Sequence, residues 1–188
     1  MIIIEANSDV KEILCSVQAL DQEKARDIAL KNLPQTPLKI MRHFIRSKPL
    51  ITKMVLVYSP FWLITFRCYF KRFRKWAKDT FDVYVLADAI TGKLWAFRST
   101  EGLKLTKIKA PKDKILRSKA KLEEIIERAS RHIKFNVLVP ILRRAIEIRT
   151  EVLDVKEFYR PTWLIFYRKN PEDKYEEIAY IRADKIPY

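Results

Sequence analysis

Glycine is nearly missing from this chain of 188 residues, which contains only Gly92 and Gly102. Loops that hold a phosphate group on backbone N–H groups need several glycines close together. The tight turns that present a nucleophilic serine need them as well. The sequence therefore argues against both of these glycine-rich loops.

Histidine and cysteine are equally scarce, with two residues of each. His43 and His132 lie far apart, and each fits a surface or helix-end position better than that of a catalytic base or metal ligand. No H-E-x-x-H, C-x-x-C or aspartate-rich calcium motif occurs. Cys15 and Cys68 are therefore expected to be reduced, mostly buried thiols. We expect no enzymatic activity, no metal ion and no cofactor.

Long apolar runs are also lacking. The longest mostly apolar run, residues 54–66, is too short to span a bilayer and contains Pro60. The first five residues lack the basic start and the small-residue cleavage site of a signal peptide. These features favour a soluble, cytoplasmic protein without a transmembrane segment. The high charge with little Asn and Gln is a weak sign of a thermophilic source.

Acidic residues are absent from one long stretch of the chain. Residues 28–78 contain no Asp or Glu but twelve Lys and Arg. The formal net charge is +15, of which residues 1–121 hold +14 and residues 122–188 only +1. With 48% hydrophobic residues the chain is globular in composition, and solubility alone would not need such an asymmetry. It suggests that one half of the chain meets an anionic partner.

Two similar stretches stand 101 residues apart, at 58–66 and 159–167, and share the pattern Tyr-x-Pro-x-Trp-Leu-Ile. A weaker match follows, because residues 85–89 resemble residues 181–185. An internal repeat of this size is typical of two similar half-domains packed together. The sequence therefore predicts an α+β fold of two tandem helix-plus-antiparallel-meander repeats, possibly related by a pseudo-two-fold axis.

Local patterns place the elements of each unit. We expect a strand at 1–5, a helix over 9–17 capped by Ser8 or Asp9, a helix over 21–33 capped by Asp21, and a helical piece over 38–46. Ser118 is expected to cap a helix over 118–133. Expected strands are 51–58, 61–70, 81–87, 94–98, 145–155, 159–167 and 177–183, with a bulge or edge position at Pro60 and a hairpin turn over 88–93.

These elements divide the chain into four parts. Residues 1–20 are an N-terminal segment, 21–98 a basic first repeat, 99–117 a lysine-rich connector, and 118–188 a near-neutral second repeat. The connector contains Gly102 and Pro111, which makes it the best boundary candidate.

A helix followed by a meander with an Asp-Ala-x-Thr-Gly turn resembles the PepSY family and the wider cystatin-like layout. The resemblance is carried by residues 88–94 together with Tyr58, Pro60 and Trp62. It implies a non-catalytic module of the kind associated with the restraint of peptidases, which would bind a folded protein or a peptide.

Two features repeated in both units invite a chemical interpretation. Asp88 and Asp184 could pair as carboxylates, but an Asp that caps its own turn is the interpretation we favour. The repeated Tyr and Trp side chains could line a ligand groove, although we favour a role in the core. A groove would show as one pocket lined by Trp62 and Trp163 together.

The stretch 67–78 is the candidate binding site, with six basic residues, four aromatic residues and no acid. It can form a helix with one aromatic face or an extended hairpin in which aromatic and basic groups interleave. The candidate binding residues are Arg67, Tyr69, Lys71, Arg72, Phe73, Arg74, Lys75, Trp76 and Lys78.

Lys and Arg side chains neutralise phosphates, while aromatic rings stack on unpaired bases, so nucleic acid is the favoured partner. The alternative partners are an acidic protein or peptide and an anionic membrane surface. A fourth interpretation is that the stretch is a solvated hairpin without a partner. Other basic residues of the same half could extend the patch: Lys39, Arg42, Arg46, Lys48, Lys53, Lys104, Lys107, Lys109 and Lys112.

Overall fold

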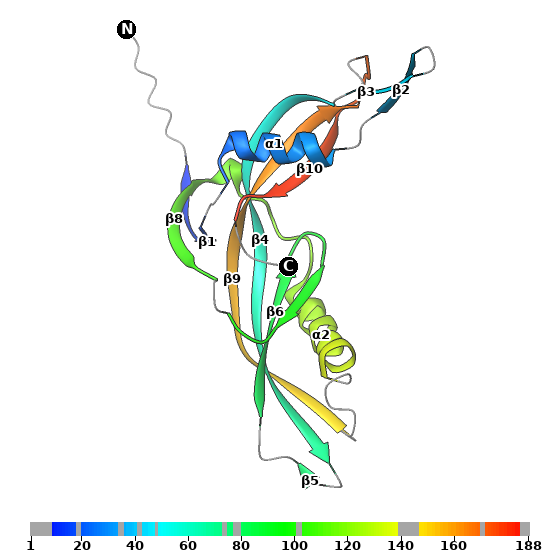
Figure 1. Ribbon diagram of the computed structural model, residues 1–188. Helices are drawn as coiled ribbons and strands as arrows, with labels where there is room; N and C mark the ends of the chain where they lie inside the picture. The colour runs from blue at the N-terminus through cyan, green and yellow to red at the C-terminus, as the bar shows by residue number, and fades with distance from the viewer. Residues whose placement is uncertain are drawn as a thin grey trace.

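The computed structural model describes residues 9–17, 20–33, 36–40, 43–47, 49–72, 75–76, 80–100, 103–138, 147–169 and 172–184 (Figure 1). Its strands are β1 (Val10–Ser16), β2 (Thr36–Ile40), β3 (His43–Ser47), β4 (Leu50–Arg72), β5 (Lys75–Trp76), β6 (Phe81–Asp88), β7 (Leu94–Phe97), β8 (Leu105–Pro111), β9 (Glu147–Arg168) and β10 (Glu177–Arg182). The helices are α1 (Gln22–Asn32) and α2 (Leu122–His132), with a 3-10 turn η1 (Lys112–Lys114) and a π-helical turn η2 (Ile133–Leu138).

Two long strands form the axis of the molecule, β4 with 23 residues and β9 with 22. They pair antiparallel from Leu50 opposite Arg168 to Lys71 opposite Glu147. The other strands extend this pair into one sheet of order β7-β6-β4-β9-β1-β8, with β10 on β9 and β5 on β4 (Figure 1). Because β1 meets β9 in parallel, the sheet is mixed.

The predicted fold class of two tandem helix-plus-meander repeats is therefore wrong. The similar stretches do not lie in separate meanders, because Tyr58 pairs with Pro161 and Pro60 with Tyr159 in neighbouring strands of one sheet. The backbone N–H and C=O groups of β4 and β9 form hydrogen bonds with each other, whereas in two separate meanders each half would have formed these bonds internally. Among the residues that the structure describes after β9, only β10 is a strand, so they form no second meander.

Proline sits inside both long strands without interrupting them, so the expected break between strands 51–58 and 61–70 and the bulge at Pro60 are wrong. The edge alternative agrees with the ladders, because β6 pairs with β4 only from Phe61 onward. The carbonyls of Pro60 and Pro161 accept hydrogen bonds from the N–H groups of Ala89 (3.1 Å) and Ala183 (2.9 Å). The nitrogen and carbonyl of one strand residue face the same neighbour, so each proline nitrogen points away from the β4–β9 ladder. The missing N–H groups therefore leave that ladder intact.

Three expected helical features are wrong. Residues 10–16 form β1 instead of a helix, because β1 pairs with β8 along its whole length. Residues 36–40 and 43–47 pair locally as β2 and β3, a separate two-stranded sheet. The Ser118 hydroxyl donates to the Ala89 carbonyl (3.3 Å) instead of capping α2, whose N-cap residue is Lys121. The expected strand at 1–5 lies outside the described residues.

The capping of α1 follows the sequence. The Asp21 side chain accepts a hydrogen bond from the Lys24 N–H at 2.9 Å, as expected for an N-cap. This bond is the main reason why the pKa of Asp21 is lowered. Buried Ala25, Ala29 and Leu33 pack α1 onto one end of the sheet, against Trp163, Ile165, Tyr167 and Ala183.

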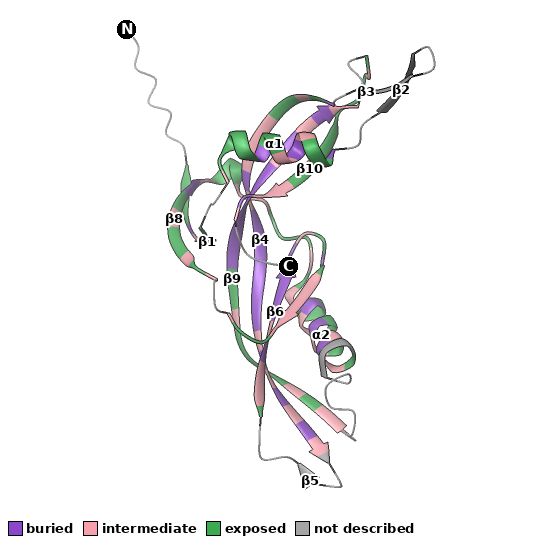
Figure 2. Ribbon diagram, viewed as in Figure 1, coloured by how far each residue is buried: buried purple, intermediate pink, exposed green. Residues whose placement is uncertain are grey.

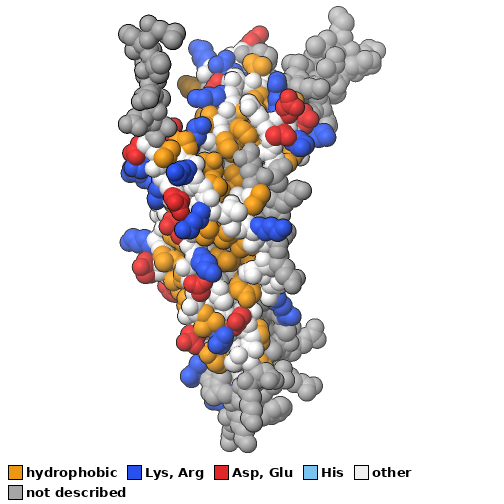
Figure 3. Space-filling model, turned by 90° about the vertical axis from the view of Figure 1, so that its left-hand side faces the viewer, with side chains coloured by type: hydrophobic (Ala, Val, Ile, Leu, Met, Phe, Trp, Pro, Cys, Tyr) orange, Lys and Arg blue, Asp and Glu red, His pale blue; other side chains and the backbone are white. Residues whose placement is uncertain are grey.

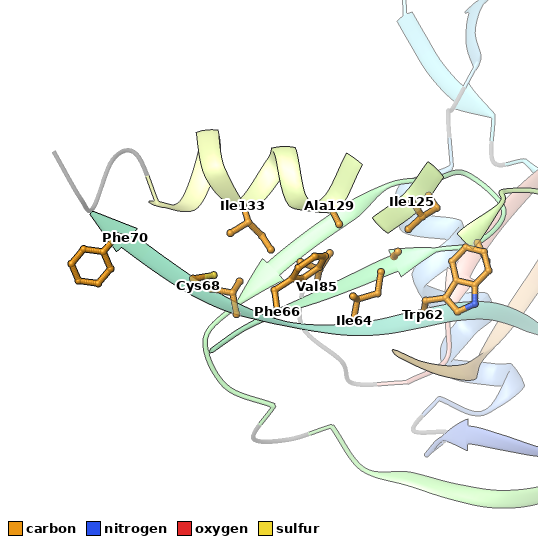
Figure 4. Close-up of a cluster of buried hydrophobic side chains, with 12 residues drawn as sticks. Trp62, Ile64, Phe66, Cys68, Phe70, Val85, Ile125, Ala129 and Ile133 are labelled. Carbon is orange, nitrogen blue, oxygen red and sulfur yellow. The ribbon is translucent and has the colours of Figure 1, made fainter. Parts of the chain in front are cut away.

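The second helix, α2, covers a different part of the sheet. Figure 4 shows Ile125, Ala129 and Ile133 facing Trp62, Ile64, Phe66 and Cys68, which are alternate residues of β4. Trp62 and Trp163 thus belong to two separate cores, and each is 8% exposed. The interpretation of the repeated aromatic side chains as core residues is confirmed for these two tryptophans.

The middle of the sheet is buried on its other face as well (Figure 2). Phe61, Leu63, Leu86 and Phe158 form a cluster there, with Trp95 of β7 packed against it. No helix in the described part of the chain has the length and apolar character needed to cross a membrane.

Candidate functional site

The base of the predicted binding hairpin is neutralised by carboxylates. Arg67 contacts Asp82 of β6, with Nε 3.1 Å from Oδ1 and Nη2 3.4 Å from Oδ2. The Tyr69 hydroxyl donates to Glu151 Oε2 at 2.8 Å, and Lys71 Nζ lies 3.7 Å from a carboxylate oxygen of Glu147.

These contacts also shift two pKa values at the base of the hairpin. The bond to Asp82 is the main cause that raises the pKa of Arg67, and the bond to Glu151 the main cause that raises the pKa of Tyr69. Both partners favour the protonated form, so neither group changes charge near neutral pH. At the base of the hairpin, neighbouring carboxylates therefore already balance the positive charges of Arg67 and Lys71.

The tip of the hairpin is extended as far as its backbone is described. Lys71 pairs with Trp76 and Arg72 with Lys75, so β4 and β5 form the hairpin and not the helical alternative. The side chains of Arg72, Lys75 and Trp76 are not described, and Phe73, Arg74 and Lys78 lie outside the described residues.

The lysine-rich connector, which in the structure continues to Lys121 at the start of α2, is fixed to the sheet by its backbone. The Leu116 N–H donates to the Tyr58 carbonyl at 3.0 Å, and the N–H groups of Lys119 and Ala120 both donate to the Ala89 carbonyl, at 2.9 and 3.0 Å. Within the connector, β8 pairs with β1. Residues 105–120 are therefore bound to the sheet and do not form a loose linker.

Five exposed connector cations form no ion pair within the described part of the chain, and we call them the connector surface: Lys104, Lys109, Lys114, Arg117 and Lys119. Three other connector lysines pair with carboxylates: Lys107 with Glu12, Lys112 with Asp9 and Lys121 with Glu124. Exposed pairs of this kind contribute little. Figure 3, which faces the side of β1 and β8, shows Lys and Arg side chains interspersed with Asp and Glu.

A pocket of about 810 Å³ lies where this surface meets the sheet, and we call it the connector pocket. Its walls come from the turn between β6 and β7, from residues 116–119 and from the edge formed by β10. The lining residues are Ser59, Asp88, Ile90, Thr91, Lys93, Trp95, Leu116, Arg117, Lys119, Leu164, Tyr180 and Arg182. Four of these are basic and one is acidic.

The polar part of the lining is one connected network. Arg182 donates from Nη2 to Asp88 Oδ2 at 2.9 Å and from Nη1 to Thr162 Oγ1 at 2.7 Å. The Ser59 hydroxyl donates to the same Thr162 oxygen at 3.2 Å. The Arg182 guanidinium also lies 4.8 Å from the centre of the Phe61 ring. Arg182 is thus held by an anion, a hydroxyl and a ring.

The turn that forms one wall is rigid. Asp88 Oδ1 accepts hydrogen bonds from the N–H groups of Ile90 (2.9 Å) and Thr91 (3.2 Å), so the expected turn-capping role of Asp88 is confirmed. Gly92 has φ of +69°, as the predicted hairpin turn requires. Arg128 of α2 donates to the Gly92 carbonyl at 3.0 Å.

Asp184 does not repeat the role of Asp88. Its carboxylate is buried and pairs with Arg160, with 2.6 Å between Nη2 and Oδ1. The two aspartates are thus bound to different arginines, Asp88 to Arg182 and Asp184 to Arg160. Within the described residues, no three His, Cys, Asp or Glu side chains lie close enough to hold a metal ion.

Sequence reasoning missed most of the connector pocket. It singled out the turn at 88–93, which contains Lys93, and four connector lysines, but it named none of Lys93, Arg117, Lys119 and Arg182 as a binding residue. Lys93 stands in the recognised turn and Lys119 follows the connector, so a charge count along both segments could have found them. Arg182 gives no such signal, because its partner Asp88 is 94 residues away. Of the other basic residues suggested as extensions, Lys53 lies over the Phe166 ring at 5.9 Å.

The remaining suggested extensions have no described side chains: Lys39, Arg42, Arg46 and Lys48.

Comparisons of the chain with protein-family models, with curated proteins and with solved structures find no match.

Proposed function

We propose that this protein is a non-catalytic binding protein that engages an anionic partner, and that the partner is single-stranded nucleic acid. The observation that carries the proposal is the connector surface, whose five exposed cations form no ion pair within the described residues. In the sequence, Arg72, Arg74, Lys75 and Lys78 of the hairpin tip belong to the same basic half of the chain. Buried free thiols at Cys15 and Cys68 support a reducing, cytoplasmic setting.

The physical basis is counterion release. Each lysine or arginine that neutralises a phosphate frees condensed cations from the strand, and this gain shrinks as salt is added. If about five phosphates are neutralised, log K should fall with log salt with a slope of about −3.5 for a single strand. The carboxylates beside Arg67 and Lys71 make the base of the hairpin a weaker contact than the connector surface.

The test measures the affinity of a labelled 20-nucleotide single strand by fluorescence anisotropy between 50 and 200 mM salt. The connector variant carries Lys104→Glu, Lys109→Glu and Lys114→Glu, and the hairpin variant carries Arg72→Glu, Arg74→Glu and Lys75→Glu. The control carries Arg26→Glu, Lys31→Glu and Lys174→Glu, which changes the net charge equally on exposed residues elsewhere.

The proposal expects the connector variant to lose at least about tenfold in affinity relative to the control and to show a shallower salt slope. The hairpin variant should also lose affinity, because the tip would contact the same strand. An equal loss in all three variants would mean that only net charge matters, and the proposed surface would be wrong. A partner recovered from cell extract after nuclease treatment, with weak salt dependence, would point instead to a protein-binding module.

A further inference from the structure

We propose that the connector pocket binds one nucleotide unit, an aromatic base carrying a phosphate, as a free nucleoside phosphate or as the terminal nucleotide of a strand. The inference deepens the proposed function and rests on it, because Arg117 and Lys119 belong to both the connector surface and the pocket.

The charge of the lining selects an anion. Lys93, Arg117 and Lys119 are exposed around the pocket and form no ion pair within the described part of the chain. The fourth cation, Arg182, already pairs with Asp88, the one carboxylate of the lining. Three positive charges therefore remain for a ligand, and a phosphate group offers the acceptors that Lys and Arg bind most strongly.

The apolar part of the lining selects a flat ring. Trp95 contributes from β7 and Tyr180 from β10, and Ile90, Leu116 and Leu164 add aliphatic side chains to the lining. Tyr180 is 65% exposed, so its ring is open to a ligand in the pocket. Stacking of a base on an aromatic side chain contributes about 1–3 kcal/mol. A ligand that is both ring and phosphate uses both parts of the pocket.

The pocket is also held in shape before any ligand arrives. Residues 116–119 are tied to the backbone of Tyr58 and Ala89, and Arg128 holds the turn at Gly92. The Arg182 guanidinium is fixed by Asp88 and Thr162. Little ordering is left for the ligand to induce, which lowers the cost of binding. The volume of about 810 Å³ falls within the usual range for small-molecule sites.

The test is isothermal titration calorimetry of the full chain with adenosine monophosphate, and separately with inorganic phosphate, adenosine and decanoate. The proposal expects the nucleotide to bind at least about tenfold more tightly than any of the three probes that lack one part of it. A 5′-phosphorylated strand compared with its 5′-hydroxyl form distinguishes a terminal nucleotide from a free one. Equal binding of phosphate alone or of decanoate would overturn the inference.

Two matched pairs of variants locate the site. Arg117→Glu with Lys119→Glu should weaken nucleotide binding at least about tenfold, whereas Arg26→Glu with Lys31→Glu should not. Tyr180→Ala should weaken it about threefold or more, whereas Tyr175→Ala, at a residue that is 86% exposed and does not line the pocket, should not. Unchanged binding in both pocket variants would overturn the inference.

The outcomes also distinguish this inference from the proposed function. If the single strand binds through Lys104, Lys109 and Lys114 but the nucleotide does not bind, the proposed function is supported and the inference of a nucleotide site in the pocket is overturned. If the nucleotide binds but no strand does, the proposed function fails, and the pocket is a site for a free nucleoside phosphate.

Discussion

Arg160 and Asp184 form a buried ion pair with two parallel hydrogen bonds, Nε to Oδ2 at 2.7 Å and Nη2 to Oδ1 at 2.6 Å. Their side chains are 0% and 1% exposed. The Ser16 hydroxyl donates to the same carboxylate at 2.5 Å, and the guanidinium lies 5.1 Å from the centre of the Phe61 ring. The pair thus joins β1, β9 and the segment after β10 in the middle of the fold.

Asp184→Asn is expected to destabilise the protein by about 3–5 kcal/mol, because removing one charge of a buried pair leaves the other charge buried without its counter-ion. The free energy of unfolding from urea titration measures the loss. Asp154→Asn is the matched control, since Asp154 pairs with Lys156 on the surface and exposed pairs contribute about 0–1 kcal/mol. Losses of similar size in the two variants would contradict the prediction.

Gly92→Ala is expected to destabilise the protein by about 1–2 kcal/mol, because Gly92 has φ of +69°. An added Cβ would also lie 2.7 Å from Arg128 Nη1, so that side chain would have to move. Gly92→Asn should cost less, since Asn tolerates left-handed backbone better than Ala. Thermal unfolding of both variants checks the order, and an Ala variant as stable as the wild type would contradict it.

Phe66→Ala is expected to cost about 3–5 kcal/mol, because Phe66 is 1% exposed and packs beneath α2. Phe135→Ala removes the same ring from a residue that is 68% exposed and should change stability by less than about 0.5 kcal/mol. Urea titration of the pair tests whether α2 and β4 form the core shown in Figure 4. Equal effects would show that they do not.

The thiols of Cys15 and Cys68 are expected to react slowly with thiol-specific reagents at pH 8. Burial raises the pKa of Cys15 to about 12, with a smaller contribution from the Asp184 charge, and burial raises the pKa of Cys68 to about 11. The thiolate is the reactive form, so both residues should react slowly with a disulfide reagent in the native protein and rapidly in denaturant. Rapid reaction of both thiols under native conditions would contradict the burial of these residues.

The same pKa shifts set the direction of an alkaline effect on stability. An unfolded thiol ionises near pH 8.5, whereas the folded thiols stay protonated to higher pH. As the pH rises, the unfolded state therefore releases these protons first. The contribution of the two thiols to the free energy of unfolding is fully present below about pH 8.5 and is lost as the pH rises towards 11 and 12. Cys68→Ala should flatten part of this fall in urea titrations between pH 8 and 10.5. An unchanged pH profile would contradict the assignment to Cys68.

The sequence by itself determined the features that depend on a few neighbouring residues. Asp21 caps α1, Asp88 and Gly92 form the turn between β6 and β7, and the strands β6 and β10 were expected at their places, because each signal acts within one turn or one strand. The same local pattern marked Trp62 and Trp163 as core residues. The extended form of the basic hairpin was one of two alternatives that the sequence allowed.

Only the tertiary structure decided which strands pair, and this choice determined the rest. β1 is a strand because β8 lies beside it, and Pro60 fits inside β4 because its nitrogen faces away from β9. The carboxylates of Glu151 and Glu147, which contact Tyr69 and Lys71, and the walls of the connector pocket come from segments far apart in the chain. Local sequence patterns carry no record of such contacts, because they form only when distant segments pack together.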